Sequence, residues 1–224
     1  SKMQASKDAS PYGAAVFVYP ESDYQNMKLF MTEDGSAGIA IEDGDTIVSL
    51  YSDGTNPNVT YSLASLAVEE GGRYSDAFDT QLPYIYQHVG FKVISRLKWD
   101  DSQAPSDWDK DTFKVFNKGK PDVVFMVVDP EYFGPYSKDV GDYVETYDEG
   151  LRSVRETESP APKVERPEGF EDLSFIKKKQ INKETGTLDD GSQSTNAFTY
   201  NDEIDGQADL SRRLKNRPIY KSLV

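Results

Sequence analysis

The sequence of 224 residues predicts a mixed α/β fold followed by a long extended C-terminal tail. In its first part, segments whose apolar residues alternate every second position follow segments with helical spacing, which is typical of a sheet covered by helices. From about residue 159 onward proline, glycine, serine, threonine and charged residues dominate, so this part buries too little apolar surface to offset its ordering entropy. We therefore expect an α/β domain over 1–135, a connecting segment with helical character over 136–158, and an extended low-complexity tail over 159–224.

The N-terminal part of the domain is expected to contain a strand, a helix and a hairpin. The run AAVFVY (14–19) is typical of a short buried strand, and 22–31 carries apolar residues at helical spacing. The hairpin over 38–51 is the clearest of the three, because Asp43 and Gly44 supply the positive φ angles that a tight turn needs. Its strands are apolar on both sides, so we expect helices on both faces of the sheet.

The rest of the domain alternates between helices and strands. In chain order we expect a helix, a strand, a helix, a strand and, after a long excursion, a last and most apolar strand. Their ranges are 61–70, 73–79, 80–90, 91–99 and 121–130. The passage LPYIYQHVGFKVISRLKW (82–99) shows the change most clearly. Its apolar residues recur at helical spacing up to Val89 and at every second position after Gly90.

Composition argues against several kinds of site. The chain has no cysteine and a single histidine, His88, so it has neither a disulfide framework nor a multi-histidine metal centre, and we expect no metal. No apolar run approaches the roughly eighteen residues of a membrane span. We therefore expect a soluble protein.

The net charge of −14 is placed unevenly along the chain. Residues 1–151 hold 12 basic and 26 acidic side chains, whereas 152–224 are balanced. An acidic domain repels phosphates, so we expect no nucleic acid to bind to it. The last fourteen residues, 211–224, carry five basic side chains and no acidic one, and they either contact an acidic neighbour or remain solvated.

The order of elements resembles that of the GNAT acyltransferase superfamily over roughly 14–130. The most specific match is YIYQHVGFKVISR (84–96), which is similar to the helix-to-strand stretch of the type LYxxxGF in that family. The stretches AVEEGGRYSDAFDTQLPYIYQHVGFKVISRLKWDD and GKPDVVFMVVDP also resemble GNAT-like domains that tailed bacteriophages encode in particle-associated proteins.

This resemblance implies a site between two adjacent parallel strands that splay apart, with the thioester of acyl-CoA in the gap. In active relatives a tyrosine four residues before the glycine of the Gly-Phe pair often protonates the departing thiolate, and Tyr86 stands at that position. Tyr86 equally fits a core aromatic residue beside Leu82 and Val89. Asp76, in the short strand, is the candidate general base, and its alternative is a surface carboxylate.

The resemblance also implies a pyrophosphate loop of the form Gln/Arg-x-x-Gly-x-Gly/Ala, which corresponds here to 52–62. The candidate cofactor-binding residues in it are Gly54, Thr55 and Asn56. This stretch lacks the leading Arg or Gln and the second glycine. Asp53 brings a negative charge where two phosphates would lie, and Pro57 removes one N–H group, so both disfavour CoA.

Two functions therefore stay open. The first is a structural or interaction protein with a non-catalytic GNAT-like domain, without cofactor, that docks through 152–224 onto other proteins of a larger assembly such as a bacteriophage virion. The alternative is an active N-acetyltransferase that uses acetyl-CoA on a cationic amine, which an acidic surface would attract. The expected location is a virion particle or the host cytoplasm.

Overall fold

A computed structural model of the chain describes residues 2–55, 58–129, 131–132, 136–138 and 140–157, together with the backbone of two short tail segments, 176–177 and 198–200. No helix in these ranges has both the length and the apolar character that crossing a bilayer requires. The expected tail over 159–224 lies outside the described residues except for the two short segments.

The described elements alternate between helices and strands along the chain. They are α1 (Lys2–Ala9), the 3-10 helix η1 (Gly13–Ala15), α2 (Glu21–Tyr24), β1 (Lys28–Thr32), β2 (Ala37–Glu42), β3 (Thr46–Ser52), α3 (Val59–Glu69), β4 (Tyr74–Phe78), α4 (Leu82–Gln87), β5 (Phe91–Leu97), the 3-10 helix η2 (Asn117–Gly119), β6 (Val123–Val128), β7 (Asp142–Val144), α5 (Tyr147–Glu156), β8 (Ile176–Lys177) and β9 (Phe198–Tyr200).

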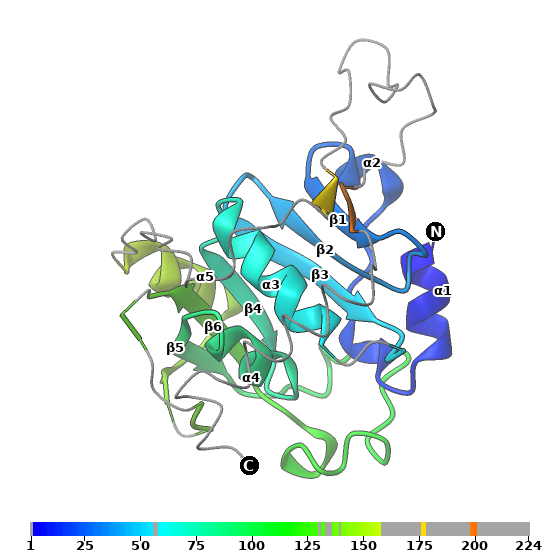
Figure 1. Cartoon of the computed structure of the whole chain (residues 1–224). Coiled ribbons are helices and arrows are strands. Elements are labelled where there is room, and N and C mark those ends of the chain that lie inside the picture. Colours follow the sequence, from blue (N-terminus) through cyan, green and yellow to red (C-terminus); the bar gives the residue numbers. More distant parts are fainter. Residues whose placement is uncertain are drawn as a thin grey trace.

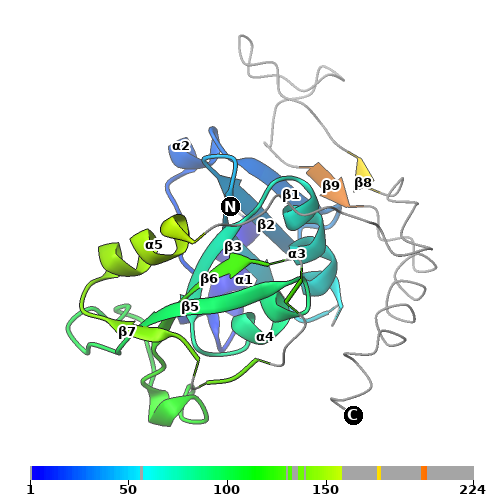
Figure 2. The same ribbon diagram turned by 90° about the vertical axis from the view of Figure 1, so that its left-hand side faces the viewer.

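The strands of the described residues form one mixed sheet in the order β7-β5-β6-β4-β3-β2-β1-β9-β8, with β1–β6 labelled in Figure 1 and β7, β8 and β9 in Figure 2. Three neighbouring pairs are parallel, namely β5 with β7, β3 with β4 and β1 with β9, and the other pairs are antiparallel. Figure 2 shows α3 and α4 on one face of the sheet and α5 on the other. The mixed α/β fold with helices on both faces is therefore confirmed.

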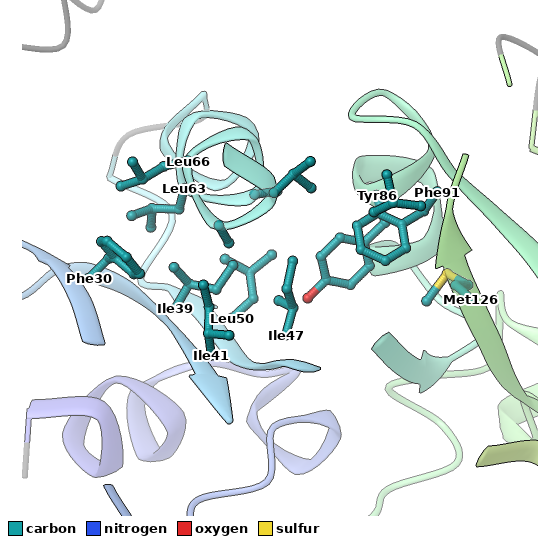
Figure 3. Close-up of a cluster of buried hydrophobic side chains, with 14 of the residues drawn as sticks. Phe30, Ile39, Ile41, Ile47, Leu50, Leu63, Leu66, Tyr86, Phe91 and Met126 are labelled. Carbon is teal, nitrogen blue, oxygen red and sulfur yellow. The ribbon is translucent and has the colours of Figure 1, made fainter. Parts of the chain in front are cut away.

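The main core lies between the sheet and the helices α3 and α4. Its side chains come from alternate positions of the strands and from the inner face of α3, and Figure 3 shows ten of them with labels. A smaller cluster of Phe125, Val127 and Val154 lies under α5 on the opposite face. Both faces of β6 are thus buried, which explains why its sequence is apolar at every position.

Two expectations for the N-terminal part are wrong. The segment 14–19 does not join the sheet, because its first residues belong to η1 and the rest runs on without strand pairing. The stretch 22–31 divides into the single turn of α2 and the strand β1. In β1 the buried side chains Phe30 and Thr32 alternate with more exposed ones, so the short apolar run 29–31 fits a strand as well as a helix.

The other expected elements are confirmed with small shifts of their ends. The hairpin 38–51 forms β2 and β3, with Asp43 and Gly44 at positive φ in the turn. The expected helix over 80–90 is shorter, and Gly90 has a φ of 94° where the chain turns into β5. The segment 136–158 contributes both β7, paired with β5, and α5.

Candidate functional site

The candidate site is the gap between the parallel strands β3 and β4. A single register pair joins them, Thr46 with Tyr74. At that end, the carbonyl oxygen of Asp45 accepts hydrogen bonds from the backbone N–H of Arg73 at 2.6 Å and of Tyr74 at 3.1 Å. Further along, β3 contains Ser49 with a φ of 58°, and the ladder between β2 and β3 shifts its register nearby. The two central strands therefore separate after their first contact.

A serine hydroxyl bridges this gap from inside the core. Ser75 Oγ donates a hydrogen bond to the carbonyl oxygen of Ile47 over 3.0 Å, from β4 to β3. The hydroxyl of Tyr86 interacts with Ser75, and Figure 3 shows the Tyr86 oxygen directed toward Ile47. On the α3 and α4 face, the gap is thus occupied by side chains of the protein itself.

Tyr86 is a member of the main core. Its side chain is 2% exposed, and its ring lies 5.1 Å from the ring of Phe91. Leu82 and Val89, which share its helical face, pack against the same core. Burial raises the pKa of Tyr86 well above its usual value of 10, so its hydroxyl holds its proton firmly.

Asp76 lies on the opposite side of β4 from Tyr86. Successive side chains of a strand point to opposite faces, so Ser75 faces Tyr86 while Asp76 faces α5. There Tyr147 Oη donates a hydrogen bond to Asp76 Oδ2 over 2.9 Å. Burial raises the pKa of Asp76, and burial together with the Asp76 charge raises the pKa of Tyr147. The two candidate catalytic residues are therefore on different faces of the sheet.

A second tyrosine and carboxylate pair lies beside Asp76. Tyr19 lies close to Glu42, and burial followed by the Glu42 charge raises the pKa of Tyr19 to about 12. Burial and the nearby Asp43 charge raise the pKa of Glu42. Tyr147 interacts electrostatically with both members of this pair, so the two pairs form one group.

We call the surface formed by Phe17, Tyr19, Glu42, Asp76 and Tyr147 the acidic-aromatic face. Sequence reasoning identified only Asp76 of these five. Glu42 follows a strand and precedes a turn, so its position suggested a turn residue, and no sequence pattern links it to Tyr147, more than a hundred positions away. Tertiary packing creates the group, since it brings Tyr147 of α5 to Asp76 of β4 and Tyr19 to Glu42 of β2.

The loop after β3 holds the candidate cofactor-binding residues Gly54 and Thr55, and Asn56 lies outside the described residues. The backbone N–H of Gly54 donates to Ser52 Oγ over 3.1 Å, and that of Thr55 donates to Asp53 Oδ1 over 2.9 Å. The Thr55 hydroxyl also donates to Asp53 Oδ1. Side chains of the loop thus already bond the N–H groups that a phosphate would need.

A buried charged network at the other end of β4 was not predicted. Its members are Arg96, Asp79, Asp122, Tyr136 and Tyr143. Arg96 lies 3.4 Å from Asp79 Oδ2 and 3.2 Å from Asp122 Oδ2. Asp79 accepts a hydrogen bond from Tyr136, and Asp122 accepts one from Tyr143. Because both tyrosines belong to the segment after β6, the network holds that segment against the domain.

Comparison of the chain with models of known families, with curated proteins and with solved structures finds no match. Among the side chains that the structure describes, no group of three or more histidine, aspartate or glutamate residues has an arrangement suited to a metal ion. The geometry of the gap and of the acidic-aromatic face is therefore the basis on which function is argued.

Proposed function

We propose that this chain is a structural or interaction protein whose GNAT-like domain is non-catalytic and whose C-terminal tail docks it into a larger assembly, such as a bacteriophage virion. The hairpin β2–β3, the crossover through α3 to β4 and the divergence of β3 from β4 agree with the arrangement that the GNAT resemblance implies. The observation that carries the non-catalytic part is the Ser75 to Ile47 hydrogen bond inside the gap.

An acyl thioester in this gap would compete with side chains of the protein. The Ile47 carbonyl is already bonded to Ser75, and the buried Tyr86 ring lies behind that bond. Breaking one such hydrogen bond costs about 1 kcal/mol, and moving a large buried aromatic side chain out of a packed core costs several times more. Filling of the gap by the protein's own side chains therefore disfavours a cofactor there.

The loop after β3 supports the same proposal. Asp53 bonds both the N–H and the hydroxyl of Thr55, so a pyrophosphate would have to displace a carboxylate from the groups it needs. The carboxylate charge also repels the phosphates. The loop is therefore stabilised without a ligand.

Calorimetric titration of the full chain with acetyl-CoA tests the non-catalytic part. We expect no binding heat, for the wild-type protein or for Ser75→Ala, which removes the bridge but leaves the Asp53 loop. The matched variant Asp53→Ala removes the carboxylate from the loop and keeps the Ser75 bridge in the gap. Comparing it with Ser75→Ala shows whether the loop or the gap prevents binding. Micromolar binding by the wild-type protein would overturn this part of the proposal.

Sedimentation with purified particles tests the assembly part. A variant that ends at Thr157 keeps α5 and lacks the tail, and its thermal unfolding shows whether the domain still folds. We expect this variant to fold and to remain in the supernatant while the full chain sediments with the particle. Equal sedimentation of both proteins would contradict docking through the tail.

A second candidate function rests on the acidic-aromatic face. Asp76 has a raised pKa and lies beside Tyr147, so it can accept a proton near neutral pH better than an ordinary carboxylate. This supports the alternative of an N-acetyltransferase that acts on a cationic amine with acetyl-CoA. Release of free CoA thiol in the presence of polyamines, abolished by Asp76→Asn, would favour the alternative over the structural role.

A further inference from the structure

An unpaired apolar segment, Val16–Tyr19, borders the acidic-aromatic face. Phe17 is 69% exposed and its ring lies 4.8 Å from that of Tyr19, while Val16 and Val18 are half-buried. Among the described residues none accepts a hydrogen bond from the N–H of Phe17 or Val18. Such a segment has the β-branched and aromatic side chains of a strand but no neighbouring strand.

The carboxylates next to this segment lack cationic partners. Asp23, Glu42, Asp43 and Asp76 influence one another electrostatically, and within the described part of the chain none of them forms an ion pair with lysine or arginine. Arg155 at one border is bound to Asp45 and Thr46. The face therefore combines exposed aromatic rings with uncompensated negative charge.

Lys7, at the other border of the face, is also engaged. Its Nζ donates to the Val16 carbonyl over 2.9 Å and lies 3.3 Å from Asp107 Oδ2. Neither bordering cation is available to neutralise the four carboxylates. A basic, partly apolar peptide would complement the face in both charge and polarity.

The last fourteen residues of the chain have this complementary composition. The segment 211–224, SRRLKNRPIYKSLV, carries five basic side chains and no acidic one. Its second half adds apolar and aromatic side chains. They are Ile219, Tyr220, Leu223 and Val224. Outside this segment, no other stretch of fourteen residues in the chain contains five basic residues and no acidic residue.

The path of the tail brings this segment within reach. Strand β9 pairs with β1, with Tyr200 opposite Thr32, so only ten residues separate the sheet from residue 211. Ten residues span at most about 35 Å. Neighbouring strands are about 4.8 Å apart, so Glu42 on β2 and Asp76 on β4 lie about one and three strand spacings to the side of β1. Glu42 also lies beyond the Lys28 end of β1, four residues or about 13 Å along the strand from Thr32, and this distance too is within the reach of the segment.

We infer that the basic C-terminal segment 211–224 folds back onto the acidic-aromatic face of its own chain. The arginine and lysine side chains lie against Glu42, Asp76 and their neighbours, and the apolar half lies along Val16–Tyr19. This contact does not depend on whether the domain binds acetyl-CoA. Because the segment is tethered through β9, its effective concentration at the face is high and the contact within one chain is favoured over that between two chains.

Paramagnetic relaxation measured by NMR tests this inference on the full chain. The protein has no cysteine, so Ser222→Cys provides a unique site for a nitroxide label. We expect loss of amide signal for Phe17, Tyr19 and Asp76 in isotope-labelled protein at low salt. We expect recovery of these signals at about 1 M NaCl, where the Debye length is about 3 Å. Undiminished signals at low salt would overturn the inference.

Charge variants identify the surface. Glu42→Gln with Asp76→Asn removes two charges and keeps acceptors for Tyr19 and Tyr147, and we expect it to restore the signals. The matched control, Asp100→Asn with Asp111→Asn, removes two charges from the excursion between β5 and β6 and should leave the signal loss unchanged. Equal effects of both pairs would contradict a defined docking surface.

A mixing experiment decides which chain supplies the segment. Isotope-labelled protein without nitroxide is mixed with unlabelled Ser222→Cys protein that carries it. We expect no signal loss in this sample, because the contact is within one chain. Signal loss here equal to that in the singly prepared protein would show that a second copy supplies the segment and would overturn the inference. Titrating the same samples with acetyl-CoA measures cofactor binding separately. Failure of this inference can thus be told apart from failure of the proposed function.

Discussion

The two sides of strand β4 differ in chemistry although their side chains are consecutive in sequence. Toward α3 and α4, Ser75 meets the buried Tyr86 and the carbonyl of Ile47 in an otherwise apolar core. Toward α5, Asp76 meets Tyr147 and lies near Glu42. The first side holds a buried tyrosine and a serine bonded to a backbone carbonyl, while the second collects partly exposed groups whose pKa values are shifted.

This difference indicates where each kind of function can reside. Groups with shifted pKa values that remain partly exposed are typical of binding and catalytic sites. A side chain that is buried among apolar residues, like Tyr86, contributes to packing instead. Recognition by this domain is therefore expected on the α5 side of the sheet.

Replacing Tyr86 by alanine is expected to have the largest effect. Its ring is 2% exposed and packs on Phe91, so Tyr86→Ala leaves a cavity and should lower the free energy of unfolding by about 3–5 kcal/mol. Urea unfolding of the full chain, followed by tryptophan fluorescence, measures the loss. Tyr86→Phe is the matched control, since it keeps the ring and loses only the hydroxyl, for about 1 kcal/mol. A small loss for Tyr86→Ala would mean that the gap is not filled as described.

Gly150→Ala tests the opposite face, where α5 packs on β6. A Cβ at position 150 would overlap the edge of the Phe125 ring, so the helix must shift although alanine favours helix formation. We expect a loss of about 1–3 kcal/mol in the free energy of unfolding by the same measurement. Arg152→Ala, at an exposed position of α5, is the control and should be nearly neutral.

A double-mutant cycle identifies the cause of that loss. Phe125→Leu removes the ring edge that position 150 would meet, at its own cost in packing. If the clash is with the ring, the loss caused by Gly150→Ala should be smaller in the Phe125→Leu background, with a coupling of at least about 0.5 kcal/mol. Strictly additive losses would place the strain elsewhere.

Much of the fold could be predicted because local patterns decide it. The hairpin turn at Asp43 and Gly44 and the change of period at Gly90 each depend on residues close in sequence. The segment 14–19 was mispredicted because its β-prone side chains suggest a strand, whereas pairing depends on a neighbour that the sequence cannot supply. β1 was missed because its short apolar run fits two periods.

The candidate site was less predictable than the fold. Asp76 was identified from its place in a short strand, but its partner Tyr147 lies 71 residues away. The Arg96 network likewise joins residues from four separate segments. Such groups arise from tertiary packing, and no local pattern in the sequence indicates them.

Asp76→Asn tests the ionisable side with the smallest expected effect. Burial raises the pKa of Asp76 in the folded protein above the value of about 3.9 expected in the unfolded chain. Between these two values the folded state binds more protons, so the free energy of unfolding falls as pH rises. An asparagine side chain cannot ionise, so the variant should gain stability relative to wild type as pH rises from about 4 and keep that gain at neutral pH. The Tyr147 hydrogen bond opposes this rise in the pKa and so reduces the gain.

Asp129→Asn provides the control of opposite sign. A hydrogen bond from Lys92, 2.8 Å from Asp129 Oδ2, lowers the pKa of Asp129, so its stabilisation is present above about pH 4 and is lost as pH falls through the lowered value. This variant should therefore be less stable than wild type at neutral pH and approach it in acid. Urea unfolding of the three proteins between about pH 3 and 7, the range that spans the carboxyl pKa values, measures both differences. Differences of the same sign would show that Asp76 is as well solvated or paired as Asp129, and the contrast between the two sides of β4 would then disappear.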